Sequence, residues 1–392
     1  EFIQELCPDG VKYLPIPELF ITRNGYTPSK ANNEFWENGT IPWFRMEDIR
    51  ENGRILTTAT QYVSEKAVKG KLFPADSIII ATSATIGEHA LIKVPSLANQ
   101  RFTYLTLKDE FKDCVDMMFV FYYCFRLDEY CKSHLNQGNF ASVDMKQFAA
   151  FKFPVPPLPV QCEIVRILDN FTELTAELTA ELTAELTARK QQYAYYRDKL
   201  LTFGDVRGGA TSDVVWKTLA EIADISTGSS NTDDAVKGGC YPFFVRSQQL
   251  LAKDEYEYDE EAIITAGDGV GVGNVFHYIN GKYALHQRAY RIHPATDGLL
   301  GKYLYHYFVA TFPKYIGQQM YQGSVPSIRR PMLNKFQVAI PSLDVQSRIV
   351  NVLDNFDAIC TDLSSGLPAE IEARQKQYEY YRDKLLSFEE KI

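Results

Sequence analysis

No run of 18 apolar residues occurs in the chain, so the sequence predicts no transmembrane helix and no membrane partner. The first ten residues contain neither a basic region nor an apolar stretch, which predicts no signal peptide. The seven cysteines are odd in number and irregularly spaced, as is typical of free thiols in a reducing compartment, so we expect a cytoplasmic protein. Cys114, Cys124 and Cys131 match no zinc spacing, and we interpret them as core residues.

The chain has fewer basic than acidic residues, and the formal net charge of its 392 residues is -9. The net charge is −2 for residues 1–153, −2 for 154–203, −1 for 204–337 and −4 for 338–392. Proteins that bind DNA alone are usually basic, because neutralisation of phosphates drives their affinity. The chain therefore either does not bind DNA or binds it together with a basic partner.

Motifs that carry catalysis are absent from the sequence. The glycine-rich stretch Gly267–Gly273 misses the spacing of a dinucleotide-binding loop, because Val272 and Asn274 stand where the last glycine is required. A predicted strand follows this stretch, whereas phosphate binding needs the start of a helix. The sequence also has no ATP-binding loop, no methyltransferase motif and no convincing nuclease site, and its six histidines are scattered. We therefore expect no catalytic residue and no metal site in this chain.

A long segment is instead present twice. Residues 156–203 and 341–388 align without a gap at an offset of 185, and 26 of the 48 positions are identical. A shorter repeat, Leu-Thr-Ala-Glu, runs in tandem from Leu174 to Ala188 in the first copy. The sequences between the copies differ from each other. This pattern predicts a duplicated scaffold that carries two different heads, an arrangement suited to a target with two parts.

The first copy has the pattern of one long helix. Gln161–Phe203 contains no glycine or proline, and its apolar residues recur every three or four positions. Such a helix would extend about 64 Å, so we expect it to pair with a second helix. In the second copy, Gly366 and Pro368 predict a break, with a new helix from Leu367 or Pro368. The simplest arrangement is an antiparallel pair related by a pseudo-twofold axis.

The two heads share landmarks although their sequences differ. Ile41–Arg45 resembles Tyr241–Arg246, and Asn99–Arg101 resembles His286–Arg288. Both heads also contain a short β-branched run that predicts a buried strand, followed later by an aromatic-rich helix. The strands are expected at Ser77–Ala81 and Ala262–Ala266, and the helices at Val115–Lys132 and Gly301–Tyr315. Both heads therefore should have the same mixed α/β fold.

The repeat also predicts where the chain ends lie. The end of the second copy, followed by the start of the chain, would recreate the junction between the first copy and the second head. We therefore expect a cyclic organisation in which the two ends lie near each other.

The ends of the two scaffold copies carry nearly identical polar and aromatic residues. Arg189–Lys199 closely matches Arg374–Lys384, which suggests docking of two copies of one partner. Packing of the helix ends within the chain is the alternative. The candidate docking residues are Arg189, Tyr193, Tyr196, Arg197, Arg374, Tyr378, Tyr381 and Arg382.

Taken together, these residues resemble the specificity subunit of Type I restriction–modification enzymes. The resemblance rests on the duplicated Leu-Asp-Asn-Phe and Tyr-x-Tyr-Tyr-Arg-Asp-Lys-Leu-Leu segments, the tandem Thr-Ala-Glu-Leu spacer, Ile-Pro-Trp-Phe at residues 41–44, and Pro-x-Pro-Pro-Leu at residues 154–158. It covers essentially the whole chain, and the spacer points to the subgroup with such repeats. Within the family's pattern, each repeat of about 6 Å would change the gap in a DNA target by about 1–2 base pairs.

The resemblance implies an α+β (mixed) fold, with two α/β target recognition domains separated by two long antiparallel helices. The expected boundaries are residues 1–155 and 204–340 for the recognition domains, and 156–203 and 341–392 for the helices. The chain would read double-stranded DNA without catalysis. Two modification (methyltransferase) subunits would bring S-adenosylmethionine, and restriction subunits would bring ATP-driven translocation with its Mg. These partners would also supply positive charge.

Within each head, base reading requires side chains that can contact base edges, above all Arg for guanine and Asn or Gln for adenine. Any single candidate can instead be a surface residue or hold the fold. The candidates in the first head are Arg45, Thr82, Ser83, Asn99, Gln100 and Arg101. Those in the second head are Arg246, Asp268, His286, Gln287, Arg288, Ser324, Arg329 and Arg330.

Three other interpretations remain. A structural coiled-coil adaptor with protein-binding heads would explain the acidity, but it explains two related heads on a symmetric frame less well. An active methyltransferase or nuclease is disfavoured by the missing motifs. A silent variant that supplies heads by recombination is the third.

Overall fold

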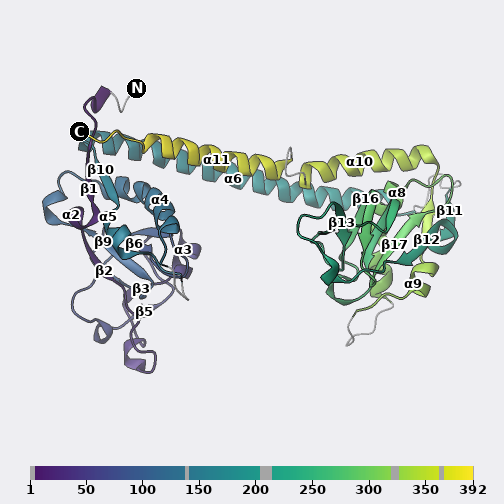
Figure 1. Cartoon of the computed structure of the whole chain (residues 1–392), viewed down its shortest axis with the longest axis horizontal. Coiled ribbons are helices and arrows are strands. Elements are labelled where there is room, and N and C mark those ends of the chain that lie inside the picture. Colours follow the sequence, from purple (N-terminus) through teal and green to yellow (C-terminus); the bar gives the residue numbers. More distant parts are fainter. Residues whose placement is uncertain (1–4, 137–140, 204–213, 319–325, 362–365, 392) are drawn as a thin grey trace. The chain divides into compact units, whose positions relative to one another are not determined.

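The computed structural model describes residues 5–136, 141–203, 214–318, 326–361 and 366–391. It divides into two compact units (Figure 1). Unit 1 comprises Glu1–Thr179 and Ala373–Ile392, and unit 2 comprises Ala180–Glu372. Helices α6 (Leu158–Leu200) and α11 (Leu367–Leu385) each contribute residues to both units.

Unit 1 is built around a five-stranded sheet of order β2-β9-β6-β7-β4. Its centre is β6 (Ser77–Ala81), whose five residues are all buried, because neighbouring strands flank it and α4 (Met117–Ser133) packs on the sheet. The predicted strand and helix are therefore confirmed here. The other strands are β2 (Phe20–Asn24), β4 (Ile55–Leu56), β7 (His89–Ile92) and β9 (Phe102–Leu107).

A smaller sheet of order β5-β3-β8 completes the head of unit 1. Strand β3 (Ile41–Phe44) runs parallel to β8 (Leu97–Ala98) and antiparallel to β5 (Tyr62–Val63). Strands β1 (Lys12–Pro15) and β10 (Lys152–Val155) form a separate pair beside α2 (Ile16–Leu19). The remaining elements are α3 (Met46–Asn52), α5 (Met145–Ala150), η1 (Asn33–Phe35), η2 (Glu65–Ala67) and η3 (Asp109–Phe111).

Unit 2 has one six-stranded sheet of order β12-β17-β15-β16-β13-β14, against which α8 (Gly301–Gly317) packs. The strand expected at Ala262–Ala266 is the buried end of β15, and α8 confirms the second aromatic-rich helix. The sheet comprises β12 (Ala223–Thr227), β13 (Tyr241–Phe244), β14 (Leu251–Lys253), β15 (Tyr258–Ala266), β16 (Phe276–Leu285) and β17 (Ala289–Pro294). The other elements are β11 (Val215–Thr218), β18 (Gln337–Ile340), α7 (Leu219–Ile222), α9 (Arg330–Lys335), α10 (Leu343–Thr361), η4 (Thr232–Asp234) and η5 (Gly269–Gly271).

The two units repeat one element order, which confirms the mixed α/β fold expected for both heads. A short helix leads into the first sheet strand in each, α2 into β2 and α7 into β12. The pair formed by β1 and β10 has its counterpart in β11 and β18. In each case the second strand of the pair leads into a scaffold helix, α6 or α10.

Two buried glutamines show that the likeness extends to single hydrogen bonds. Gln161 accepts from the backbone N–H of Asp116 at 2.8 Å and donates to the carbonyls of Cys114 and Pro156 at 2.8 and 2.7 Å. Gln346 stands at the same place in the second copy. It accepts from the N–H of Leu300 at 2.9 Å and donates to the carbonyls of Gly298 and Pro341, both at 2.8 Å. Each glutamine ties a scaffold helix to its own head.

We expect Gln161→Leu to lower the free energy of unfolding of unit 1 by about 3 kcal/mol or more, because one N–H and two carbonyls would lose their buried partner. Gln346→Leu should have the same effect on unit 2. Thermal and urea unfolding of the purified chain would measure both changes. The matched control is Gln191→Leu at an exposed position of α6, where we expect little change. Equal stabilities for all three variants would contradict the anchoring role.

The helices follow the sequence pattern closely. The predicted helix at Gln161–Phe203 is α6, which begins three residues earlier at Leu158 and ends at Leu200. The predicted break is confirmed, since α10 ends at Thr361 and α11 begins at Leu367, with Pro368 in its first turn. Residues Ser364 and Ser365, which were part of the predicted break, lie outside the described residues.

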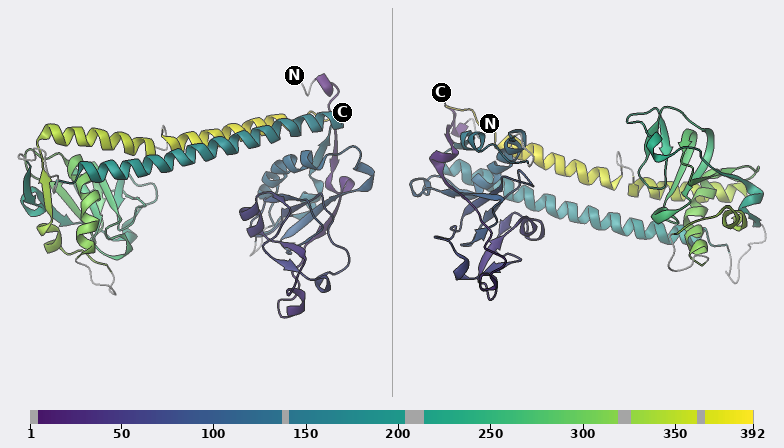
Figure 2. Two further views of the ribbon diagram at one scale, coloured as in Figure 1. Left: turned by 180° about the vertical axis from the view of Figure 1, so that it is seen from behind. Right: turned by 60° about the horizontal axis from the view of Figure 1, so that its bottom comes forward.

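Within each unit, the scaffold helices run antiparallel. In unit 1, Phe171 of α6 contacts Tyr381 of α11. The next residue of α6, Thr172, forms a hydrogen bond with Tyr378, three residues earlier in α11, so the two helices run in opposite directions. Figures 1 and 2 show α6 and α11 alongside each other in this unit. In unit 2, Tyr196 of α6 stacks on Phe356 of α10 at 5.8 Å, while Tyr193 lies near Asp357 and Lys190 lies near Cys360, so these helices also run in opposite directions.

The described ends of the chain meet in unit 1, as the repeat predicts. The N–H of Val11 donates to the carbonyl of Glu389 at 2.8 Å, and the N–H of Lys391 donates to the carbonyl of Val11 at 2.9 Å. An ion pair of 2.7 Å between Lys152 and Glu390 lies beside them. The last residues therefore extend the β1 region of the first head.

The cysteine prediction is confirmed in part. Cys124 and Cys131 are buried in the core of unit 1, but Cys114 is exposed, so its assignment to the core was wrong. Its position explains the error, because Cys114 lies before α4 begins rather than on the helix. Among the described residues, no group of three or more His, Cys, Asp or Glu could hold a metal ion. In the same part of the chain, every helix is too short or too polar to span a membrane.

Candidate functional site

The predicted base-reading residues gather where paired strands end. In unit 1, β3 and β8 are parallel, and the N–H of Asn99 after β8 donates to the carbonyl of Phe44 at 3.0 Å. In unit 2, β13 and β16 are parallel, and the N–H of His286 after β16 donates to the carbonyl of Phe244 at 2.9 Å. Arg45 directly follows β3, whereas Arg246 follows β13 after one more residue. Parallel strands end at the same edge, so each arginine comes to lie near the neighbouring turn.

The turn itself has the same hydrogen bond in both units. The backbone N–H of Arg101 donates to the side-chain oxygen of Asn99 at 2.9 Å. The backbone N–H of Arg288 donates to Nδ1 of His286 at 2.9 Å. The side chain of the first residue of each turn therefore fixes the backbone of the third residue. The glutamine between them, Gln100 or Gln287, remains exposed.

A second strand end meets this turn in each unit. The N–H of Thr82 donates to the carbonyl of Arg101 at 2.9 Å, and the N–H of Gly267 donates to that of Arg288 at 2.8 Å. The next residue then forms an isolated bridge, Ser83 with Ser142 and Asp268 with Ser327. The backbone of the candidate site is thus the same in both units, while the side chains that it presents differ.

The structure brings together most of the predicted residues. Arg329 and Arg330 are exposed at the start of α9, one residue beyond Ile328, whose N–H donates to the carbonyl of Gly267 at 2.8 Å. They therefore lie beside the second strand end rather than in the turn. Ser324 lies outside the described residues.

The site of unit 2 is an open cavity of about 490 Å³. One wall is the turn His286–Arg288 together with Arg246, and the other is the segment Asn231–Asp234. Gln287 donates to the side-chain oxygen of Asn231 across this space. The cavity is polar, and both acidic and basic groups line it.

An ion-pair cluster occupies the base of this site. Asp268 accepts from Nη1 of Arg246 at 2.6 Å through one carboxylate oxygen and from Nη1 of Arg288 at 3.2 Å through the other. Partial burial disfavours the charged form of Asp268, but hydrogen bonds and positive charge from the two arginines outweigh it and hold its pKa below the ordinary value. Asp268 is therefore ionised at neutral pH and shared between two guanidinium groups.

His286 is buried beside this cluster. Burial and the nearby charges of Arg246 and Arg288 lower its pKa, so the ring is neutral at neutral pH. Because Nδ1 accepts the hydrogen bond from Arg288, the proton of the neutral ring lies on Nε2. The ring, which lines the cavity, therefore has one N–H donor.

Unit 1 presents different chemistry on the same frame. Arg45 donates to the hydroxyl of Thr60 at 2.9 Å and lies 3.9 Å from Glu47, and its guanidinium is near the ring of Trp43. Ser83 stands where unit 2 has Asp268, so the carboxylate that pairs two arginines in unit 2 has no equivalent at this position. Gln100 is held by the hydroxyl of Thr27, much as Gln287 is held by Asn231.

Sequence reasoning missed two kinds of residue. Thr27 and Asn231, which hold the two turn glutamines, follow no motif, and only the fold brings them to the site. Val270 was considered only as part of a glycine-rich loop, yet its side chain is 94% exposed. An exposed apolar side chain two residues after Asp268 is a contact candidate, and its neighbours Gly269 and Gly271 were the available signal.

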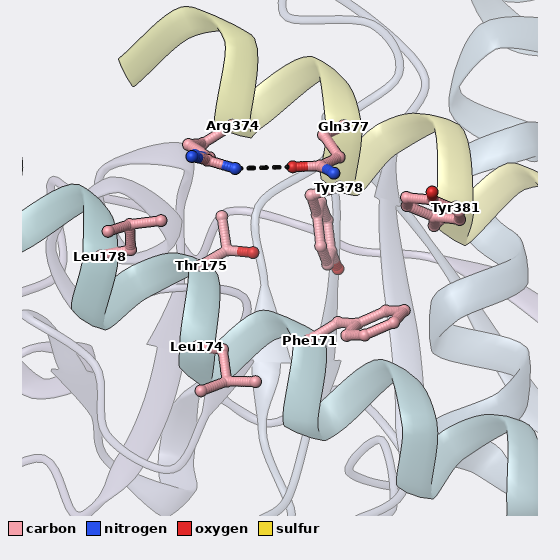
Figure 3. A pocket seen from close by; sticks show the side chains of 8 residues that line it. All are labelled: Phe171, Leu174, Thr175, Leu178, Arg374, Gln377, Tyr378 and Tyr381. Atoms are coloured by element: carbon pink, nitrogen blue, oxygen red, sulfur yellow. Dashed lines mark hydrogen bonds between the residues drawn. The ribbon is translucent and has the colours of Figure 1, made fainter. Parts of the chain in front are cut away.

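Three of the predicted docking residues, Arg374, Tyr378 and Tyr381, line a groove between α6 and α11 in unit 1 (Figure 3). The groove has a volume of about 210 Å³. Phe171 and Tyr381 face each other at 6.1 Å, and Nη1 of Arg374 donates to Gln377 at 3.2 Å. The lining residues are Phe171, Leu174, Thr175, Leu178, Arg374, Gln377, Tyr378 and Tyr381.

Unit 2 repeats the contacts of this groove with the matching residues of the other copy. Nη1 of Arg189 donates to Gln192 at 3.0 Å, and Tyr196 stacks on Phe356. Burial, with the charge of Asp357 nearby, raises the pKa of Tyr193 to about 12, so its hydroxyl stays protonated. Both Tyr196 and Tyr381 remain exposed, which leaves these rings available to a partner.

The two remaining docking candidates are mainly occupied within their own units. Arg197 pairs with Asp198 at 2.9 Å, and the same carboxylate also reaches Lys314 at 3.2 Å. Arg382 pairs with Asp383 at 2.9 Å, and its guanidinium lies 4.3 Å from the centre of the Phe125 ring. Arg382 therefore joins its helix end to the head, and Asp198, the partner of Arg197, does the same through Lys314, which is the alternative considered for the matched segment.

Comparison with known proteins gives a consistent result. The family model described as Type I restriction modification DNA specificity domain matches residues 8–188 and 211–373. The chain is 43% identical over 377 residues to the specificity subunit of the Type I restriction enzyme EcoprrI from Escherichia coli, covering 92% of this chain and 91% of the relative. It is 34% identical to the EcoR124I/EcoR124II specificity subunit of the same organism, covering 65% of this chain and 68% of the relative.

Solved structures are similar in fold across the chain. A chain from a structure described as the basis of complex assembly and conformational transition of the type I R-M system matches with a TM-score of 0.69 and 14% identity, covering 96% of this chain and 97% of that one. The HsdS subunit from Thermoanaerobacter tengcongensis matches with a TM-score of 0.57 and 15% identity, covering 96% of each chain. Both matches concern the fold alone.

Proposed function

Because the chain belongs to the family of Type I restriction modification DNA specificity domains, we propose that it is a non-catalytic specificity subunit whose two heads each read one half of a bipartite DNA target. Membership in this family gives the chain a role in DNA sequence specificity. The finer statement, one head for each half-site, is the proposal. It concerns the recognition domains 1–155 and 204–340, with the helical segments 156–203 and 341–392 as spacers.

The observation that carries the proposal is a shared backbone frame with different side chains. The backbone N–H groups of Thr82 and Gly267 make equivalent hydrogen bonds in the two heads, and so do those of Asn99 and His286. The side chains at these equivalent positions nevertheless differ. Two heads that performed the same task would have no need to differ at these positions. Two heads that read different bases need a common frame and divergent side chains.

Each candidate then has a chemical role. The arginines suit guanine or phosphate, the amides of Asn99, Gln100 and Gln287 suit adenine, and the hydroxyls of Thr82 and Ser83 suit either base. Arg329 and Arg330, exposed at the start of α9, suit contacts with the sugar–phosphate backbone, and Ser324, outside the described residues, stays a candidate from the sequence. Val270 is added to this set as an apolar side chain that can contact a thymine methyl group.

The proposed partners rest on the groove of unit 1, on the matching stacked contact of unit 2 and on the charge of the chain. We assign one modification subunit to the groove of Phe171 and Tyr381 and a second to the matching contact of Tyr196 and Phe356. These subunits would carry S-adenosylmethionine and the adenine methylation, and restriction subunits would carry ATP and Mg. A net charge of -9 is compatible with DNA binding if these partners neutralise many of the phosphates.

The deciding experiment is methylation mapping by long-read sequencing in a host that expresses the chain together with its modification subunit. We expect a bipartite motif with modified adenines on both strands. A stable complex that methylates no sequence would favour the coiled-coil adaptor or a silent variant. Methylation by the purified chain alone would contradict the non-catalytic role.

Exchange of one head should alter one half-site. We expect that replacement of residues 1–155 by the matching head of a relative changes one half of the motif, while the other half and the gap stay as they were. The reciprocal exchange of residues 204–340 is the matched control and should change the opposite half. The same mapping experiment measures both. Changes in both halves after a single exchange would contradict independent reading.

A further inference from the structure

Asp268 holds two arginines that reach the site from different strands. Arg246 follows β13 and Arg288 follows the paired strand β16, so the fold, rather than the sequence, brings them together. Each donates one Nη1–H to a separate oxygen of the same carboxylate. The side chains of Arg246 and Arg288 remain 39% and 61% exposed, and that of Asp268 is 28% exposed.

This arrangement leaves donors available on both arginines. Within the described residues, neither guanidinium has another hydrogen bond, so Nη2 and Nε of each remain for a ligand. Two adjacent donors of a planar guanidinium match the O6 and N7 acceptors of guanine in the major groove. A guanidinium that is already held on one side loses less conformational entropy when it binds.

The equivalent position in unit 1 supports a specific role. Ser83 forms the same backbone bridge as Asp268, but it cannot neutralise or orient two arginines. Arg45 is turned instead toward Thr60 and Glu47. The paired arrangement is therefore a property of unit 2 and not a requirement of the common fold.

We infer that Arg246 and Arg288 read guanine in the half-site of unit 2 and that Asp268 is the positioning residue that aims both side chains at the bases. The inference rests on the proposed function and goes beyond it, because it names the base and the residues. The inference also distinguishes a positioning role of Asp268 from a role in which its carboxylate only neutralises positive charge. A masking group would weaken binding to every sequence equally, whereas a positioning group affects particular G·C pairs.

The test compares three variants by methylation mapping and by competition binding of the complex to duplexes that differ at single base pairs. Asp268→Ser introduces the residue of unit 1, and Asp268→Asn preserves the shape while removing the charge. Arg288→Lys keeps the charge but removes the two-donor fork. The matched control is Asp297→Ser, because Asp297 is an exposed carboxylate of unit 2 that neither lines the cavity nor pairs with either arginine in the described part of the chain.

We expect all three variants to lose preference for guanine by roughly 10-fold at one or two G·C pairs of one half-site, in line with the loss of a two-donor base contact. The half-site should be the one that changes when residues 204–340 are exchanged. The other half-site should still be read, which shows that the variants fold. The control should keep the motif of the unmodified chain.

Three results would overturn the inference. They are an unchanged motif in both Asp268 variants, uniformly tighter binding without a change in base preference, and relaxation only at A·T pairs. Failure of the proposed function looks different, because the unmodified chain would then show no bipartite motif at all. If Asp268→Ser does not fold, Arg288→Lys still decides the question, since it retains the carboxylate and the positive charge.

Discussion

Deletion of Leu182–Glu185 should shorten the gap between the two half-sites by about 1–2 base pairs, while both half-sites stay the same. The deletion removes one Leu-Thr-Ala-Glu repeat from α6, and about 6 Å of helix with it. Leu186 then follows Glu181 directly, so the local sequence of the helix is preserved. Methylation mapping should show that the original spacing is no longer modified and that a shorter one replaces it.

The control for this deletion keeps the length of the helix. Replacement of Glu181 and Glu185 by glutamine changes the charge of the repeat, and it breaks only an exposed pair between Glu185 and Arg189, which contributes little to stability. We expect this variant to recognise the original gap. An unchanged gap after the deletion, or altered half-sites, would show that the repeat is only an apolar stripe of the helix.

Loss of the aromatic residues in the groove of unit 1, or in its stacked counterpart of unit 2, should remove one modification subunit each. We expect the double variant Phe171→Ala and Tyr381→Ala to bind one modification subunit instead of two, and the further changes Tyr196→Ala and Phe356→Ala to abolish binding. Buried aromatic residues at an interface commonly contribute about 2 kcal/mol or more each, which is roughly a 30-fold change in affinity. Native mass spectrometry of the co-purified complex counts the subunits.

Neighbouring tyrosines provide the matched control. Tyr195 and Tyr380 stand directly before Tyr196 and Tyr381 and are more exposed than they are, but neither lines the groove of unit 1 or its stacked counterpart in unit 2. We expect the double variant Tyr195→Ala and Tyr380→Ala to retain two modification subunits. The opposite pattern, with loss of binding only in this second variant, would move the docking face away from the grooves.

Local patterns predicted the elements of this chain well. The length of α6 and the break before Leu367 followed from helix propensity and from Gly366 and Pro368, which act through the local backbone. Strand β6 followed from a β-branched run, and the likeness of the heads followed from short landmarks such as Ile41–Phe44. In each case the decisive information lies within a few neighbouring residues.

The contacts of the candidate site could not be predicted in the same way. Arg246, Asp268 and Arg288 lie at least 20 residues apart along the chain. They meet because β13 pairs with β16 and because Gly267, after β15, bonds to the backbone of Arg288. The anchoring role of Gln161 was equally hidden, since it was one of many identical positions in the repeat and only its buried hydrogen bonds distinguish it. The assignment of bases to side chains stays a prediction.

Because the two ends of the chain meet in unit 1, segments that are far apart in the sequence build the same head. Val11 bonds with Glu389 and Lys391, so the last segment completes the head that the first segment begins. A circularly permuted chain could join these ends and open between Phe203 and Val214, the corresponding junction of unit 2. Such a chain would start with the other head and still contain the same contacts. The contacts that build each head therefore do not depend on which head is encoded first.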